Sequence, residues 1–169
     1  MSNKILYVFV FSAALTGCGG LGHVPSEPRE PSLASTRGLQ ARAQRSEALL
    51  VALMALGVDY HGGGRSPATG FDCSGLVAHV FEEAYGIRLP RTVRAQSETG
   101  MAVSAHELEP GDLVFYDTLG RPYSHVGIYL GEGKFVHAPK TGSSVRVESV
   151  RSAYWAKRFN GARRIEPSL

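Results

Sequence analysis

One cysteine of this chain has the surroundings of a nucleophile. Cys73 lies in the stretch FDCSGLVAHVF, where apolar residues recur at the spacing of one helix face. Asp72 directly before it is a good N-cap residue, so we expect Cys73 in the first helical turn. The positive end of the helix dipole favours a thiolate there. A lone cysteine is otherwise a small buried hydrophobe, and this stretch leaves both interpretations open.

Two histidines twelve residues apart are candidates for a base and its orienting partner. The segment SHVGIYLGEGKFVHA is typical of a hairpin with its turn at Gly131 and Glu132, and it contains His125 and His137. Because their separation is even, both side chains are expected on one face of the sheet, as direct or diagonal neighbours. A nucleophile needs a base, and that base needs a third group to orient it. With Cys73, the two histidines can fill these roles, although either one alone is as readily a polar residue of a solvated strand.

The second cysteine, Cys18, ends a hydrophobic N-terminal segment. The apolar run 5–15 is too short to span a bilayer, so residues 1–17 are predicted to be a secretory signal peptide. Its last residues, Leu-Thr-Gly-Cys, resemble the lipobox of bacterial lipoproteins, whose cysteine is acylated after cleavage. An ordinary signal peptide and a disulfide from Cys18 to Cys73 are the alternatives. Lipidation of Cys18 leaves Cys73 as the free thiol, which favours a catalytic role for it.

Helix-forming sequence precedes strand-forming sequence along the chain. Residues 18–38 are rich in Gly, Pro, Ser and charge and are predicted to be a flexible tether, which leaves residues 39–169 as one domain. The segment QARAQRSEALLVALMALG predicts a helix that Gly57 ends. Its core-facing stripe is expected to be Leu49, Leu50, Leu53 and Leu56. The later segments DLVFYD, HVGIYLG, KFVHA and SVRVESV favour an antiparallel sheet. The order predicts an α+β fold.

The composition argues against some classes of partner. Eighteen Lys and Arg against fifteen Asp and Glu give a net charge of only +3, without an aromatic-rich basic stripe, so no nucleic-acid partner is expected. A zinc hydrolase using Cys73, His125 and His137 is a rival hypothesis. Neither His-x-x-x-His nor paired Cys-x-x-Cys spacing supports it, and we expect no metal and no cofactor.

Seven ordered motifs between about residues 50 and 165 resemble the NlpC/P60 family of cell-wall cysteine peptidases: YHGGG, FDCSGLV, LPRT, LEPGDLVFY, HVGIYLG, FVHA and ARRI. The resemblance implies a papain-like α+β domain with N-terminal helices packed on an antiparallel sheet. It implies that Cys73 is the nucleophile, His125 the base and His137 the orienting residue. Tyr60 matches a tyrosine that lies beside the thiol and contributes to oxyanion binding.

The YHGGG stretch departs from the family pattern. His61 and Gly62 stand where many relatives have an aromatic or bulky residue, so substrate specificity at this rim is left open. The resemblance also leaves open an amidase or acyltransferase of the same fold, and a wall-binding lipoprotein without activity.

By the same resemblance, the substrate is a peptidoglycan stem peptide, cut between D-glutamate and diaminopimelate or at the D-alanine to diaminopimelate cross-link. These peptides are anionic, and Arg91 within LPRT is the first candidate to bind their carboxylates. A solvated loop arginine is the alternative.

The lipobox predicts where the protein resides. Lipid on Cys18 would anchor it to a Gram-negative membrane, and Gly19 and Gly20 lack the aspartate that retains lipoproteins in the inner one. We therefore expect the protein on the outer membrane, facing the periplasm. We also expect it to be a monomer.

Overall fold

The computed structural model describes residues 33–166. Cys18, the predicted signal peptide and most of the predicted tether lie outside the described residues. Helix α1, Leu33–Met54, begins inside the range assigned to the tether, and the domain boundary at residue 39 stays a prediction. Within residues 33–166, no helix combines the length and the apolar character that crossing a membrane requires.

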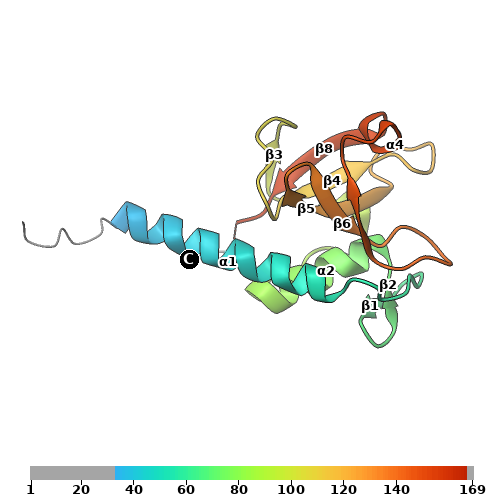
Figure 1. Cartoon of the computed structure of the whole chain (residues 1–169), viewed down its shortest axis with the longest axis horizontal. Helices are drawn as coiled ribbons and strands as arrows, with labels where there is room; N and C mark the ends of the chain where they lie inside the picture. The colour runs from blue at the N-terminus through green and yellow to red at the C-terminus, as the bar shows by residue number, and fades with distance from the viewer. Residues whose placement is uncertain (1–32, 167–169) are drawn as a thin grey trace, which may run out of the picture. The chain divides into compact units, whose positions relative to one another are not determined.

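The core of the molecule is a six-stranded antiparallel sheet with two helices on one face (Figure 1). The strand order is β3-β8-β4-β5-β6-β7. The strands are β3 Met101–Val103, β4 Leu113–Tyr116, β5 His125–Gly131, β6 Lys134–His137, β7 Arg146–Ser149 and β8 Phe159–Arg164. The remaining elements are α2 Cys73–Tyr85, the short α3 Val93–Gln96 and α4 Ala153–Ala156, and the two-stranded β1 Arg65–Ser66 and β2 Gly70–Phe71. The predicted α+β class is confirmed.

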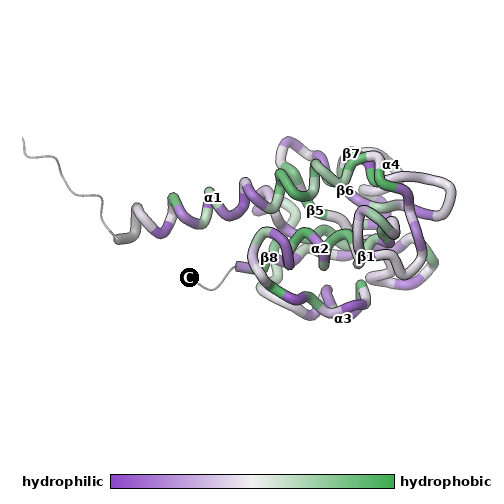
Figure 2. Tube along the Cα trace, turned by 90° about the horizontal axis from the view of Figure 1, so that it is seen from below, coloured by the Kyte–Doolittle hydropathy of each residue, from purple (hydrophilic) through white to green (hydrophobic). Residues whose placement is uncertain are grey.

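The face of α1 that enters the core consists of alanines. They are Ala48 and Ala52, four residues apart, and buried Ala55 follows them in the turn directly after the helix. Leu49 is partly buried against the core, but Leu50 is 59% exposed and Leu53 and Leu56 are each 42% exposed. The predicted leucine stripe is therefore wrong for these three residues. Small side chains let α1 approach α2 closely, and α2 supplies the bulk with Leu76, Val77, Val80 and Phe81. Figure 2 shows the hydrophobic colour along α2 and the C-terminal half of α1.

The opposite face of the sheet has its own small, aromatic core. It consists of Val114, Tyr116, Phe135, Trp155 and Ala162. Alternation along β5 divides its side chains between the two cores: Val126 and Ile128 pack with the helices, and Tyr129 packs on the opposite side. We call the two sides the helix face and the outer face.

The β5–β6 hairpin pairs Ile128 with Val136 and Tyr129 with Phe135, and its register shifts next to Gly131. Gly127 permits the close approach of the two strands. A Cβ there would lie 2.6 Å from the Phe135 ring and 2.7 Å from the Val136 carbonyl oxygen, both inside van der Waals contact. A side chain at residue 127 would thus force the hairpin apart.

Candidate active site

Cys73 is the first residue of α2, as predicted, and Asp72 caps that helix. The Asp72 carboxylate accepts hydrogen bonds from the backbone N–H of Gly75 at 2.7 Å and of Gly63 at 2.9 Å. The backbone N–H of Val126, at the start of β5, lies close enough to the sulfur of Cys73 to lower the pKa of the thiol. The cap therefore fixes the thiol where the helix meets the first residues of that strand.

The thiol of Cys73 is protonated in this arrangement. Burial and, to a smaller extent, the neighbouring Asp72 carboxylate raise its pKa to about 11, against the opposing effect of nearby backbone N–H groups. The backbone N–H groups at the helix start lower this pKa, as predicted, but the loss of water outweighs them, so the predicted net decrease is wrong for the resting site. Cys73 therefore needs a base to become a nucleophile.

His125 and His137 form a buried pair on the outer face. The Nε2 atom of His125 lies 2.8 Å from Nδ1 of His137, with the rings nearly perpendicular at 89°. The two are diagonal neighbours across the hairpin, which confirms the prediction of a shared face. Burial lowers the pKa of His125 to about 3 and that of His137 to about 4. Both imidazoles are neutral near pH 7 and can accept a proton.

The hydrogen bond between the two histidines restricts their tautomers. Since Nε2 of His125 is engaged with His137, only Nδ1 of His125 remains to take up a proton. For Nδ1 to be free, Nε2 must carry the hydrogen and donate it to Nδ1 of His137. His137 then carries its own hydrogen on Nε2.

Cys73 and the histidines lie on opposite faces of the sheet, and both are close to the start of β5. Cys73 packs at the edge of the helix-face core. The ring of His125 instead stacks on Trp155, with centroids 5.4 Å apart and an interplanar angle of 27°. Because Val126 directly follows His125 and its N–H lies near the sulfur, the thiol lies beside the backbone next to His125.

Tyr60 lies next to the thiol. Its backbone N–H donates to the Ser143 carbonyl at 2.8 Å, and it forms a parallel bridge with Phe71. Burial, and then the charges of Cys73 when it is ionised and of Asp72, raise the pKa of its phenol. The phenol keeps its hydrogen for donation, and its role in oxyanion binding stays a prediction.

Arg91 is engaged with the cap of α2. Its Nη1 donates to Oδ1 of Asp72 at 3.0 Å and to Oγ of Ser74 at 2.8 Å, and its Nη2 pairs with Oδ2 of Asp72. Burial opposes ionisation of Asp72, but these hydrogen bonds outweigh it and lower the pKa of the carboxyl. Arg91 thus holds the first turn of α2, and its predicted binding of substrate carboxylates stays a prediction.

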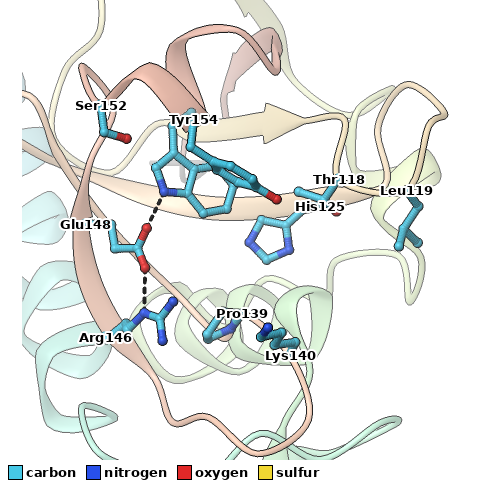
Figure 3. Close-up of a pocket in the computed structure, with 10 residues that line it drawn as sticks. Thr118, Leu119, His125, Pro139, Lys140, Arg146, Glu148, Ser152 and Tyr154 are labelled. Carbon is cyan, nitrogen blue, oxygen red and sulfur yellow. Dashed lines mark hydrogen bonds and ion pairs between the residues drawn. The ribbon is translucent and has the colours of Figure 1, made fainter.

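Two residues beside the histidine pair were not predicted from the sequence, Glu148 of β7 and Trp155 of α4. The Glu148 carboxylate accepts from the Trp155 indole N–H and, at 2.5 Å, from Nε of Arg146 (Figure 3). Its Oε1 lies 3.6 Å from Nε2 of His137. The sequence offers no signal for this contact beyond a charged residue inside the SVRVESV strand.

A cavity of about 420 Å³ opens beside the histidine pair (Figure 3). Its lining includes His125, Lys140, Arg146, Glu148, Tyr154 and Trp155. Lys140 is exposed at its rim. Among residues 33–166, no three His, Cys, Asp or Glu side chains lie close enough together to hold a metal ion.

Comparison with known proteins gives a consistent set of relatives. The NlpC/P60 family model matches residues 57–164. "Murein DD-endopeptidase MepH" of Escherichia coli is 43% identical over 113 residues, covering 65% of this chain and 42% of that protein. "Murein DD-endopeptidase MepS/Murein LD-carboxypeptidase" of Escherichia coli is 47% identical over 109 residues, covering 64% of this chain and 56% of that protein. The matched part thus spans about half the length of these curated relatives.

Solved structures of NlpC/P60 proteins are also similar to this chain. An NlpC/P60 family protein from Bacillus cereus superposes with a TM-score of 0.68 at 32% identity, covering 73% of this chain and 40% of that one. The NlpC/p60 domain of peptidoglycan hydrolase SagA superposes with a TM-score of 0.63 at 33% identity, covering 72% of this chain and 98% of that one.

Proposed function

This chain belongs to the NlpC/P60 family, and from that premise we propose that it is a cysteine-type peptidoglycan endopeptidase. One observation carries the proposal. The helix-capped thiol of Cys73 lies at the start of β5, where a buried pair of neutral histidines supplies the base. The names of the relatives, murein endopeptidases, support murein as the substrate.

In the proposed reaction, the Cys73 S–H bond breaks and the proton moves to Nδ1 of His125. The sulfur attacks the carbonyl carbon of a stem-peptide amide. The Tyr60 hydroxyl and backbone N–H groups at the start of α2 stabilise the oxyanion. His125 then returns the proton to the leaving amine, which leaves a thioester on Cys73. Water activated by His125 hydrolyses that thioester and restores the thiol.

The two charges of the activated site arise together. A lone thiolate or a lone imidazolium is disfavoured by burial, as the opposite shifts of the Cys73 and His125 pKa values show. Transfer of the proton forms both at once without changing the net charge, so each stabilises the other. His137 orients His125 and disperses the positive charge through their hydrogen bond.

We also propose that the amide cleaved is the D-alanine to diaminopimelate cross-link, which the DD-endopeptidase names of both Escherichia coli relatives favour. Arg91 stays a candidate for substrate carboxylates, and exposed Lys140 adds a cation at the rim of the cavity.

Digestion of purified murein with the full-length protein in detergent, followed by mass analysis, tests this function. We expect cross-linked muropeptide dimers to become monomers, with no conversion by Cys73→Ala. Free stem peptides released from the glycan would instead identify an amidase. Unchanged murein from a folded wild type would support the non-catalytic alternative.

The membrane location rests on the sequence motif. We propose that Cys18 is lipidated and anchors a monomer to the outer membrane of a Gram-negative bacterium, facing the periplasm. Cys18→Ser should leave an unacylated protein that no longer fractionates with membranes. A Ser variant that still floats with the outer membrane would refute the anchor.

A further inference from the structure

We propose that Glu148 is a positioning residue that acts through His137, stabilising the histidine pair when it takes up the thiol proton. The inference rests on the proposed function, since it extends the same proton path by one group. The thiol proton moves only as far as His125. Glu148 stays ionised throughout and accepts no proton.

The histidine tautomers direct a polar hydrogen at Glu148. With Nδ1 of His137 engaged by His125, the hydrogen of His137 lies on Nε2. That nitrogen is fully buried and has no hydrogen-bond partner. Unpaired buried N–H groups are rare because each one loses its hydration without compensation. The nearest carboxylate oxygen, Oε1 of Glu148, is 3.6 Å away.

This separation is too long for a hydrogen bond, but it is short enough for two opposite charges to attract each other. At rest, with His137 neutral, Glu148 contributes little. Once the pair takes up the thiol proton, the positive charge spreads toward His137 and the attraction of the carboxylate grows. The interaction is therefore stronger in the activated site than in the resting one, which is the condition for accelerating a reaction.

Trp155 holds Glu148 in place for this role. Its indole N–H donates to Oε2 of Glu148, while the same ring stacks on His125 and meets His137 edge-on at a centroid distance of 5.0 Å. One side chain thus fixes both histidines and the carboxylate. Glu148 is half-buried, so water screens its charge only in part.

Arg146 opposes Glu148 at the same atom. Its Nε donates to Oε1 of Glu148, the oxygen that faces His137. The positive charge of Arg146 lowers the pKa of His137, whereas the negative charge of Glu148 raises it. The other charged groups at this cavity are His125 on β5 and Lys140 after β6. Glu148 and Arg146 therefore act on the pair with opposite signs.

Opposite signs separate an electrostatic role from structural damage. In Glu148→Gln, the amide still fits the space and can accept from Trp155, but the negative charge is lost. In Arg146→Gln, the repelling cation is lost while the amide can still donate to Glu148. Glu98→Gln is the control, since it removes one carboxylate from an exposed ion pair with Arg94 elsewhere.

The experiment measures kcat and KM on purified murein fragments, and the rate of Cys73 alkylation against pH, for the full-length variants. Without the carboxylate the imidazolium is less stable, so Glu148→Gln should move the alkylation profile to higher pH. It should also lower kcat about tenfold with KM nearly unchanged, the effect that a shift of one pKa unit corresponds to. Arg146→Gln should move the profile to lower pH. Glu148→Asp should restore part of the loss, and Glu98→Gln should match the wild type.

The single tryptophan of the chain reports on folding, because only Trp155 contributes an indole N–H resonance. If Glu148→Gln unfolds and loses this resonance, the alkylation profile of Arg146→Gln alone tests the inference. Shifts of both variants in the same direction, or an unshifted profile in a folded variant, would overturn the inference. A wild type that leaves murein intact would refute the proposed function instead, while the alkylation profiles would still test Glu148.

Discussion

The two faces of the sheet contribute different halves of the site. The helix face is an aliphatic core closed by alanines, and it carries the thiol on a capped helix whose polar groups are paired. The outer face is a small aromatic core that buries two histidines and leaves Nε2 of His137 without a hydrogen-bond partner. In the proposed reaction, the helix face positions the thiol and the outer face supplies a base whose pKa is lowered by burial. The proposed reaction therefore depends on β5, the strand whose side chains pack on both faces.

The largest effect is expected from substitutions that remove one reacting group from either face. Cys73→Ala and His125→Ala should each lower turnover by about 10⁴-fold or more, to near background, because neither the nucleophile nor its base can act alone. The double variant should be hardly slower than either single one. Murein turnover and thermal unfolding of all three test this. Additive losses would mean that the two faces act independently.

Acid should loosen the outer face before the helix face. Both histidines have pKa values below the ordinary 6.5, so their stabilising contribution is complete above that pH and is lost as pH falls toward about 3 to 4. Asp72, whose pKa is below 3.8, loses its contribution only in stronger acid. Urea unfolding should show a loss on the order of a few kcal/mol between pH 7 and pH 4.

Replacing both histidines by Gln should remove most of that acid sensitivity. Fluorescence of Trp155 on the outer face should change at higher pH than the helical circular dichroism signal. Coincident transitions in the wild type would show that the faces do not differ in this respect.

Loss of the orienting residue should hurt less than loss of the base. His137→Ala leaves both reacting groups and removes the group that steadies the imidazolium, so we expect about 100-fold lower turnover and an apparent thiol pKa above that of the wild type. Alkylation rate against pH measures the shift. An unchanged profile would contradict the assignment of His137 to the proton path.

The smallest effect is expected from a substitution in β5, the strand shared by both faces. Gly127→Ala should destabilise the fold by about 1 to 3 kcal/mol, because the new methyl group meets the Phe135 ring and the Val136 carbonyl. Gly62→Ala is the matched control, since nothing lies within 4 Å of a Cβ there. Chemical denaturation of the pair gives the difference. Equal stabilities would mean that the hairpin accommodates a side chain without strain.

Local patterns predicted the parts of the site that depend on neighbours in sequence. The cap at Asp72, the helix that begins at Cys73 and the shared face of His125 and His137 follow from helix capping and from the alternation of strands. The four predicted strand segments contain β4 to β7. These features need only a few residues on either side to be specified.

Features that depend on distant pairing were missed. The hydrophobic pattern favoured leucines as the core residues of α1, but alanines fill that position. The pattern could not show this, because the distance between α1 and α2 is set by tertiary packing. Strand β8 lies between β3 and β4, a placement that no local pattern specifies. The contact of Glu148 with Trp155 requires both β7 and α4 to be in place. The thiol pKa was predicted in the wrong direction, because burial is a property of the whole fold.

The protonated resting state of Cys73 also bears on chemical durability. Oxidants such as hydrogen peroxide react with thiolates far faster than with thiols, so a cysteine whose pKa is raised to about 11 is a poor target while the site is idle. In the proposed mechanism, the sulfur becomes reactive only when its proton passes to His125. Under the proposed mechanism, burial thus keeps the thiol of Cys73 intact between turnovers.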